Sequence, residues 1–374
     1  MSWNVRIFEH RTGQNGQRIG CETDIWSRTT VSLQFPQVGG STTRTCPGVR
    51  CPEFHRTVSV LGVLVSEISF RPLTPITGAE VEGVDLVADL SPTVVARLRE
   101  ALLKHKVLVF RNQPMSDAEH VALTNAFGGA TAAHPIVNGL PEEPAVLRTA
   151  LSEERKALVE AEAGLSHPLK GATPRRIRTE WHVDSTFVVN PNAITILRGV
   201  EIPQAGGDTL FANLEALYDG LSPSFRGYLD TLQAIHSRHA PSAPPRLDGK
   251  PSGPFAALHP LVTVHPETGA RSLLVSTVFL QTIRGLKARE SAALLDFLLD
   301  ELAGRDEIHA RVRWDQDTLV MWDNRSVAHA GPVDGLMFQE ERIVHRTTVV
   351  GEALTGPGGF TSRALMGGRF EALA

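Results

Sequence analysis

One histidine and one aspartate, separated by a single residue, are the pair in this sequence best suited to hold a metal ion. They are His182 and Asp184 in the segment Trp181-His182-Val183-Asp184. In an extended strand, alternate residues point to the same face, so a ring nitrogen and a carboxylate oxygen would lie side by side. His329 can supply a third ligand. Two histidines and one carboxylate leave open positions, as in non-haem Fe(II) oxygenases. Taken alone, the pair is also compatible with a surface salt bridge.

Residues of types that can bind carboxylates follow both the His182–Asp184 pair and His329 in the sequence. Thr209 follows the histidine–aspartate pair within Gly206-Gly207-Asp208-Thr209, and Arg342 and Arg346 follow His329. The two arginines are four residues apart in a predicted strand, so they share a face. A guanidinium can bind a carboxylate through two parallel hydrogen bonds. Each arginine by itself is equally compatible with a surface strand position, and Thr209 with ordinary strand preference.

Short strands separated by turn residues must position these side chains. The predicted strands are Glu67–Phe70, Ala79–Val84, Val107–Phe110, Thr186–Val189, Ala193–Val200, Thr209–Ala212, His309–Trp314, Thr318–Trp322 and Ile343–Val350. Many short strands with helices outside them favour a mainly β fold with flanking helices, an antiparallel barrel or sandwich. The sequence has no GxGxxG or GxxxxGK[ST] motif, so nothing in it indicates a nucleotide cofactor.

Helix-capping patterns mark where two of the helices begin. Ser91-Pro92 combines a capping hydroxyl with proline at the first helical position, and Ser116 with Glu119 forms a capping box. Further helices are predicted over Asn213–Tyr218, Ser224–Ile235 and Ala288–Ala303.

The N-terminal segment, residues 1–66, differs from the rest of the chain. It holds all three cysteines, has no lysine, and is rich in glycine, threonine, proline and arginine between residues 36 and 50. Its Cys46, Cys51 and His55 do not have the spacing of a zinc ribbon. We expect a poorly ordered or wrongly assigned extension there and one domain over residues 67–374. Within that domain, the polar residues 151–176 are predicted to form a lid-like insertion.

Composition excludes several classes of function. The chain has 374 residues, 42% hydrophobic residues and a formal net charge of −4. It lacks an apolar run of about 18 residues, so we expect no membrane span. A slightly acidic chain is not typical of nucleic-acid binders. With so few cysteines and no secretory signal, we expect a cytoplasmic protein. The partner is expected to be a small anionic organic molecule, and the chain is expected to form a homo-oligomer.

Five motifs in order resemble one known family, the taurine dioxygenase-like (TauD/TfdA) Fe(II)/2-oxoglutarate-dependent dioxygenases. The motifs are WHVDSTF (181–187), GGDTLFAN (206–213), VHPETGARSLLV (264–275), MWDNRSVAHAG (321–331) and RIVHRTTVVGE (342–352). The resemblance covers about Ile68–Gly351 and implies a double-stranded β-helix (jelly roll) core.

The same resemblance implies the cofactors and their ligands. Fe(II) would be held by His182, Asp184 and His329, and the distal carboxylate of the cosubstrate 2-oxoglutarate by Thr209 and Arg342. O₂ is the third reactant. An aspartate at 184 also excludes the halogenase variant of the family, in which the carboxylate ligand is replaced.

A His-Pro pair points to one branch of this family. His134-Pro135 resembles the pair of the sulfonate- and sulfate-ester-using enzymes, whose histidine contacts the anionic sulfur group. Arg346 matches the arginine that pairs with the same group, and the Val183 backbone N–H can add a donor. Taurine-specific members bind the amine through a tyrosine and an asparagine, where this sequence has Val137 and Arg178.

The predicted reaction is hydroxylation of the carbon next to a sulfate ester or sulfonate. It would give an aldehyde with sulfate or sulfite, and convert 2-oxoglutarate to succinate and CO₂. The first alternative is the same reaction class on an aryloxyalkanoate or another small carboxylate. Two more distant alternatives are a metal-dependent hydrolase on a cupin-like barrel and a non-catalytic binding module.

Overall fold

The fold comes from a computed structural model, which describes residues 10–12, 18–20, 68–151, 180–238, 253–331, 334 and 340–373. The chain divides into two units, Met1–Gly62 and Val63–Ala374. In the first unit, β1 (His10–Thr12) pairs antiparallel with β2 (Arg18–Gly20).

Two sequence predictions fall outside this description. They are the arrangement of Cys46, Cys51 and His55 and, apart from Leu151, the lid-like insertion over residues 151–176. The predicted division at residues 66 and 67 remains a prediction.

A seven-stranded sheet is the larger layer of the second unit. Its strands are β3 (Ser69–Pro72), β4 (Ala79–Glu82), β5 (Val107–Phe110), β15 (Leu319–Asp323), β7 (Ile194–Glu201), β17 (Arg342–Val349) and β6 (Leu147–Leu151), in that spatial order. The pair β4–β5 is parallel and the other pairs are antiparallel. Strands distant in sequence are therefore neighbours, as β5, β15 and β7 show.

A three-stranded sheet faces the inner side of this layer. It consists of β14 (His309–Val312), β8 (Thr209–Asn213) and β16 (Val327–Ala330). Side chains from both sheets form one buried cluster, to which Val320 and Trp322 contribute from β15 and Phe211 from β8. Alternate residues point to opposite faces of a strand, which explains why Leu319 and Met321 pack on the other side of the sheet.

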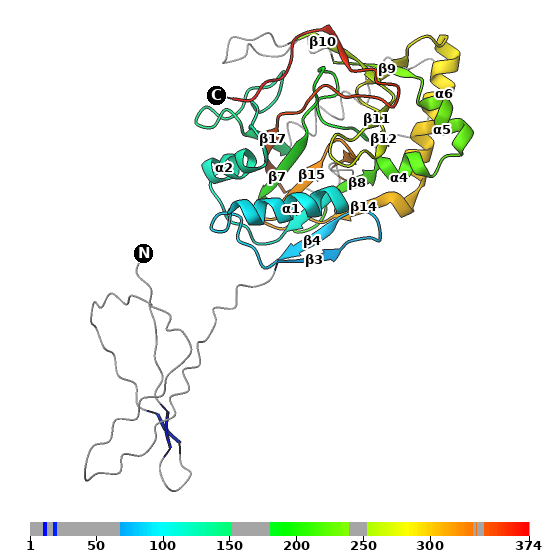
Figure 1. The fold of residues 1–374 in the computed structure, drawn as a ribbon. Coiled ribbons are helices and arrows are strands. Elements are labelled where there is room, and N and C mark those ends of the chain that lie inside the picture. The colour runs from blue at the N-terminus through cyan, green and yellow to red at the C-terminus, as the bar shows by residue number, and fades with distance from the viewer. Residues whose placement is uncertain are drawn as a thin grey trace, which may run out of the picture. The chain divides into compact units, whose positions relative to one another are not determined.

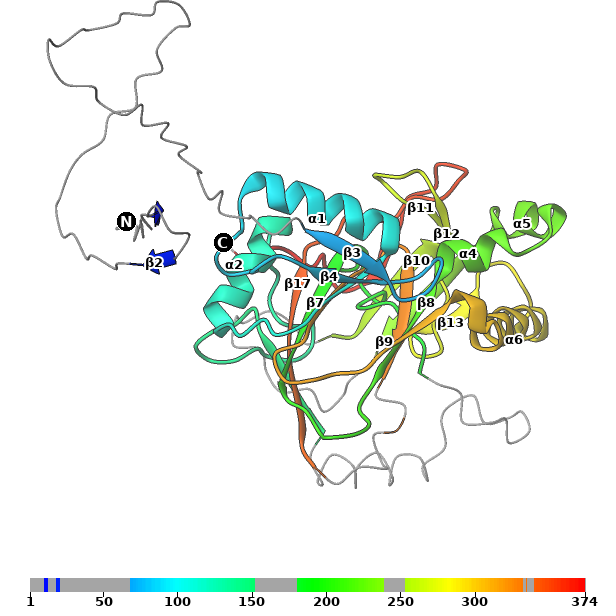
Figure 2. The same ribbon diagram turned by 90° about the horizontal axis from the view of Figure 1, so that it is seen from below.

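Two helices cover that outer side. They are α1 (Pro92–His105) and α2 (Asp117–Phe127), and their apolar residues pack against the outward residues of β5, β7 and β15. Figure 2 shows α1 lying along the sheet, over β3 and β4. Ser91 caps α1, and Ser116 with Glu119 forms the capping box of α2. Both predicted helix starts are confirmed.

The remaining elements complete the domain beside the two layers. A four-stranded sheet has the order β13 (Leu280–Ile283), β9 (Gln233–Arg238), β10 (Phe255–Pro260) and β18 (Arg363–Met366), and β11 (Val262–Val264) pairs with β12 (Arg271–Leu273). The other helices are α4 (Leu214–Asp219), α5 (Pro223–Leu229) and α6 (Ala288–Gly304), and the 3₁₀ turn η1 is Asp306–Ile308. In both views α5 and α6 lie at the end of the domain away from α2 (Figures 1 and 2). Among the described residues, no helix is long and apolar enough to cross a membrane.

The predicted mainly β class is confirmed, and two predicted elements are wrong. Residues Thr186–Val189 form turns, because Ser185 has a left-handed backbone with φ 55° and its carbonyl accepts the Val188 N–H. The helix predicted over Ser224–Ile235 ends at Leu229, and β9 begins four residues later. Pairing of β9 with β10 and β13 outweighs the local helical periodicity there.

Candidate metal centre

The two histidines are brought together by a short antiparallel bridge. His182 and His329 exchange both backbone hydrogen bonds, at 2.9 and 2.8 Å, as an isolated bridge. His329 lies on β16, whose register with β8 places it opposite Phe211. Its ring packs against the rings of Phe211 and Trp322, with a centroid distance of 4.7 Å to Trp322. Aromatic packing and backbone pairing therefore fix the direction in which the His329 ring points.

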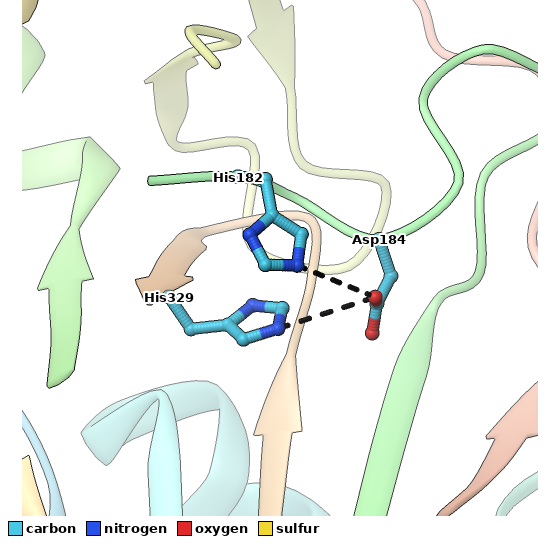
Figure 3. A group of neighbouring side chains, drawn as sticks. All are labelled: His182, Asp184 and His329. Carbon is cyan, nitrogen blue, oxygen red and sulfur yellow. Dashed lines mark ion pairs between the residues drawn. The ribbon is translucent and has the colours of Figure 1, made fainter. Parts of the chain in front are cut away.

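Asp184 reaches the same place from a turn. The prediction that His182 and Asp184 share one strand is wrong in detail, because the extended backbone ends at Val183 and Asp184 begins a turn. The alternate spacing still matters, since both side chains point to the same point in Figure 3. Each imidazole Nε2 lies 4.0 Å from Oδ1 of Asp184. Together the three residues offer ligand atoms within 4.8 Å of one another.

The protonation states of these residues suit metal binding. His182 Nδ1 lies 2.9 Å from the Glu180 carbonyl and donates its proton there, which leaves the Nε2 lone pair for a metal. Burial, with the charge of His182, lowers the pKa of His329 to about 3, so its imidazole is neutral at pH 7. Burial opposes ionisation of Asp184, but Arg346 and the two histidines outweigh it and hold the pKa of this carboxyl well below its usual range. The Nε2 atoms of the two histidines and the Asp184 carboxylate thus suit a divalent cation.

The predicted cosubstrate residues meet through a tryptophan. Trp314 donates from Nε1 to Thr209 Oγ1 at 3.0 Å, and its ring lies 5.7 Å from the guanidinium carbon of Arg342. Arg342 is buried and donates from Nε to the Gly207 carbonyl at 2.8 Å. Burial lowers the pKa of Arg342 to about 10, so it remains charged at pH 7.

A glycine is required beside this arginine. Gly207 has φ +74°, and a Cβ there would lie 2.8 Å from Cδ of Arg342. The GGDT motif therefore admits the arginine side chain next to Thr209. The result is a buried cation beside a hydroxyl, which suits a dicarboxylate.

Of the predicted substrate residues, Arg346 contacts Asp184 directly. Arg346 donates from Nη1 to Asp184 Oδ1 at 3.0 Å and from Nη2 to the Ala133 carbonyl at 3.2 Å. His134, the next residue, accepts the Ile136 N–H on Nδ1 at 3.0 Å, so its Nε2 carries the proton. Val183 is buried, and its N–H donates to no other described residue. The structure thus brings His134, Arg346 and the metal ligands into one region.

The family profile of the taurine catabolism dioxygenases, the TauD, TfdA family, matches residues 69–348. This chain belongs to that family. The match covers well over half of the chain and all the motifs from WHVDSTF to the start of RIVHRTTVVGE, so the family expected from those motifs is confirmed.

Individual relatives of this TauD/TfdA family member cover most of its length. An alkylsulfatase of Acinetobacter baylyi is 33% identical over 312 residues, which is 80% of this chain and 90% of the relative. An alpha-ketoglutarate-dependent sulfate ester dioxygenase of Pseudomonas putida is 32% identical, over 79% of this chain and 94% of its own. The crystal structure of a taurine dioxygenase from Burkholderia xenovorans is 38% identical, with a TM-score of 0.67 over 80% of this chain and 95% of its own. The expected jelly-roll fold is thereby confirmed.

Sequence reasoning missed the residues that hold Asp184 in this family member. Thr195 on β7 donates to Asp184 Oδ2 at 2.6 Å and accepts from Asn324 Nδ2 at 2.7 Å. Asn324 in turn accepts from Trp322 Nε1 at 3.0 Å. Asn324 stands inside the MWDNRSVAHAG motif, which was the available signal. No sequence signal pointed to Thr195, because threonine is common in strands for its strand preference alone.

A second network fixes the turn that precedes His329. Arg325 donates to both carboxylate oxygens of Asp323, at 2.8 and 2.6 Å, and to Glu267 at 2.7 Å. His265 binds the same Asp323 carboxylate through Nε2 at 3.0 Å, and Arg99 on α1 completes the network through Glu267. Two of the sequence motifs, VHPETGARSLLV and MWDNRSVAHAG, therefore join β16, the strand that carries His329, to the rest of the fold.

Proposed function

We propose that this chain is an Fe(II)- and 2-oxoglutarate-dependent dioxygenase that oxidises the carbon bearing a sulfate ester or sulfonate group. The product would be an aldehyde with sulfate or sulfite. The observation that carries the proposal is that Arg346 contacts Asp184 of the His-Asp-His set, while a second, buried arginine, Arg342, lies four residues earlier on the same strand. One reaction that needs two separate anions at one metal is oxidation of an anionic substrate with 2-oxoglutarate.

His182, Asp184 and His329 would hold Fe(II), which would supply O₂ activation coupled to decarboxylation of 2-oxoglutarate. The protein supplies placement. Arg342 and Thr209 bind the distal carboxylate of 2-oxoglutarate by charge and hydrogen bonding. Thr195 keeps the Asp184 carboxylate oriented. Burial of these groups keeps bulk water away, which strengthens each electrostatic contact.

Arg346 and His134 are proposed to bind the anionic sulfur group. Two nitrogens of Arg346 already have partners, but Nε is buried without a hydrogen-bond partner among the described residues. A buried donor of this kind favours an oxyanion as its partner. The Val183 N–H offers a further donor, and His134 directly follows Ala133, whose carbonyl Arg346 binds.

Two observations favour a sulfate ester or sulfonate as the substrate. They are the names of the relatives and one residue that differs from the taurine-specific members. Two relatives, named alkylsulfatase and sulfate ester dioxygenase, align with this chain over 90% and 94% of their own lengths. Val137, which stands where taurine-specific members have a tyrosine, is 44% exposed and apolar, so it offers nothing to an ammonium group. Arg178 lies outside the described residues. An alkyl sulfate or alkyl sulfonate without an amine therefore fits better than taurine.

Anaerobic titration with Fe(II) and 2-oxoglutarate, followed by oxygen and a panel of substrates, tests this function. The panel is octyl sulfate, hexanesulfonate, taurine and 2,4-dichlorophenoxyacetate. We expect succinate and sulfate in equal amounts from octyl sulfate, and oxygen consumption to match. Sulfate release without oxygen would indicate a hydrolase. A preference for the phenoxy acid would indicate the alternative substrate class, and no turnover of any member would contradict the proposal.

The expectations of a homo-oligomer and of a cytoplasmic location remain predictions. Light scattering of the purified protein and fractionation of cells test them.

A further inference from the structure

A cavity of about 150 Å³ lies next to the proposed anion site and contains none of the metal ligands. One wall is the His-Pro segment, through Ala132 and Pro135. Another is formed by residues near the C-terminus, among them Gly368 and Phe370, and Phe255 contributes an aromatic face. Most of the lining is apolar side chain or glycine, so the cavity suits hydrocarbon.

The cavity and the proposed anion site share one short segment. The Ala133 carbonyl accepts a hydrogen bond from Arg346, which in turn contacts Asp184. The residues on either side of the Ala133–His134 pair, Ala132 and Pro135, line the cavity. A molecule held at its anionic end by Arg346 and His134 therefore has an apolar space one residue away.

Aromatic rings continue from the metal ligands toward this space. Phe279 packs edge-on against His182 at 5.9 Å, and Phe187 packs against Phe279 at 5.0 Å. Phe187 also contacts Phe255, a cavity residue, at 6.0 Å, and the His134 ring at 5.7 Å. A packed apolar cluster thus lies between the His182 ring and the cavity, and Phe255 belongs to both the cluster and the cavity wall.

We propose that this cavity binds the far end of the substrate's alkyl chain, and that the C-terminal residues Gly367–Leu373 set the chain length accepted. The proposal rests on the function proposed above, because it takes an anionic head group at Arg346 as its starting point. An apolar cavity of about 150 Å³ is large enough for benzene, so about six carbons fit. Each buried methylene adds about fourfold in affinity.

The C-terminal wall is held in a defined position. Asn190 accepts the Phe370 N–H at 2.9 Å and donates to the Phe370 carbonyl at 2.6 Å. Gly367 has φ +77°, and a Cβ there would lie 2.2 Å from the Phe255 ring, so a side chain is excluded at that position. Gly368 differs, because a Cβ there would meet nothing within 4 Å. This glycine lines the cavity, and a side chain can be added there without a clash at Cβ.

The test fills the cavity from two of its lining segments. Gly368→Phe acts from the C-terminal wall and Ala132→Leu from the His-Pro segment. The control is Gly358→Phe, an exposed glycine that likewise has nothing within 4 Å of an added Cβ and lies outside the cavity. For each protein loaded with Fe(II) and 2-oxoglutarate, kcat/KM is measured for octyl sulfate and ethyl sulfate, and binding of both is measured anaerobically by calorimetry.

Two ratios compare octyl sulfate with ethyl sulfate, one of affinities and one of kcat/KM values. We expect both cavity variants to lower each ratio at least about tenfold, which corresponds to about two displaced methylenes. Gly358→Phe should leave the ratio unchanged. An unchanged ratio in both cavity variants, or an equal loss for the two chain lengths, would overturn the proposal. Calorimetry separates failure of the cavity proposal from failure of the proposed function. Octyl sulfate that binds without turnover would contradict the proposed reaction, and its affinity for the variants would still test the cavity.

Discussion

Arg346 donates a hydrogen bond of 3.0 Å to Oδ1 of Asp184, the same oxygen that lies 4.0 Å from both histidine Nε2 atoms. The proposed anion-binding arginine therefore contacts the carboxylate of the candidate metal site directly. Arg342, four residues earlier on the same strand, contacts Gly207. The two arginines of β17 thus have different partners, which allows their roles to be separated by mutation.

Arg346→Gln should weaken the primary substrate. The loss of a charge-assisted contact of about 1.5–3 kcal/mol would raise the KM for an alkyl sulfate roughly ten- to a hundredfold. Fe(II) affinity should be retained, since His182, Asp184 and His329 are intact. Steady-state kinetics and anaerobic Fe(II) titration measure the two effects. A variant that lost Fe(II) instead would show that Arg346 acts mainly by positioning Asp184.

Arg342→Ala should raise the KM for 2-oxoglutarate by a similar ten- to a hundredfold, because the distal carboxylate loses its buried cation. The KM for the primary substrate should change little. Arg289→Ala, at an exposed position in the first turn of α6, is the matched control. Equal effects of Arg342→Ala and Arg346→Gln on 2-oxoglutarate would contradict the assignment of two separate anion sites.

Removing a metal ligand should abolish succinate formation. His182→Ala, Asp184→Ala and His329→Ala each leave two ligands, which hold Fe(II) weakly. Treatment of the wild-type protein with a chelator should have the same effect, and added Fe(II) should restore activity in the wild type alone. Iron content and succinate are the readouts. Near-normal turnover in any of the three variants would refute the site.

Stability should fall as the pH drops from about 6.5 toward 4. Burial lowers the pKa of His259 to about 4, that of His120 to about 3, and that of His236 well below its usual value. The unfolded chain, with ordinary histidine pKa values near 6.5, then binds more protons than the folded chain, so acid favours unfolding. Each group contributes up to about 1.4 kcal/mol per pH unit in that window.

His259→Gln should make this pH dependence shallower. Denaturant unfolding at pH 7.5, 6 and 5 measures the free energy of unfolding for both proteins. The variant loses hydrogen bonds to Ser362 and to the Thr186 carbonyl, so it should also be less stable at pH 7.5. A wild-type protein equally stable at pH 7.5 and 5 would contradict the prediction.

Local signals in the sequence determined much of the fold, and they predicted a set of metal ligands whose side chains the fold brings together. The capping residues Ser91 and Ser116 mark helix starts that depend on neighbouring backbone N–H groups alone, and both are found in the structure. The alternate spacing of His182 and Asp184 predicted that their side chains meet, and they do so even though Asp184 lies in a turn. Such features are local because the interacting groups are within a few residues of one another.

Tertiary structure alone decided what these residues contact. The bridge between His182 and His329, the contact of Arg346 with Asp184 and the bond from Trp314 to Thr209 join residues from distant segments. Residues Thr186–Val189 form turns in place of the predicted strand, because Ser185 adopts a left-handed backbone that strand propensity does not reveal. The placement of Gly368 in the wall of a cavity depends on the packing of the C-terminal segment against β10. Periodicity reports which face of an element is buried, and only the pairing of elements determines which side chains meet there.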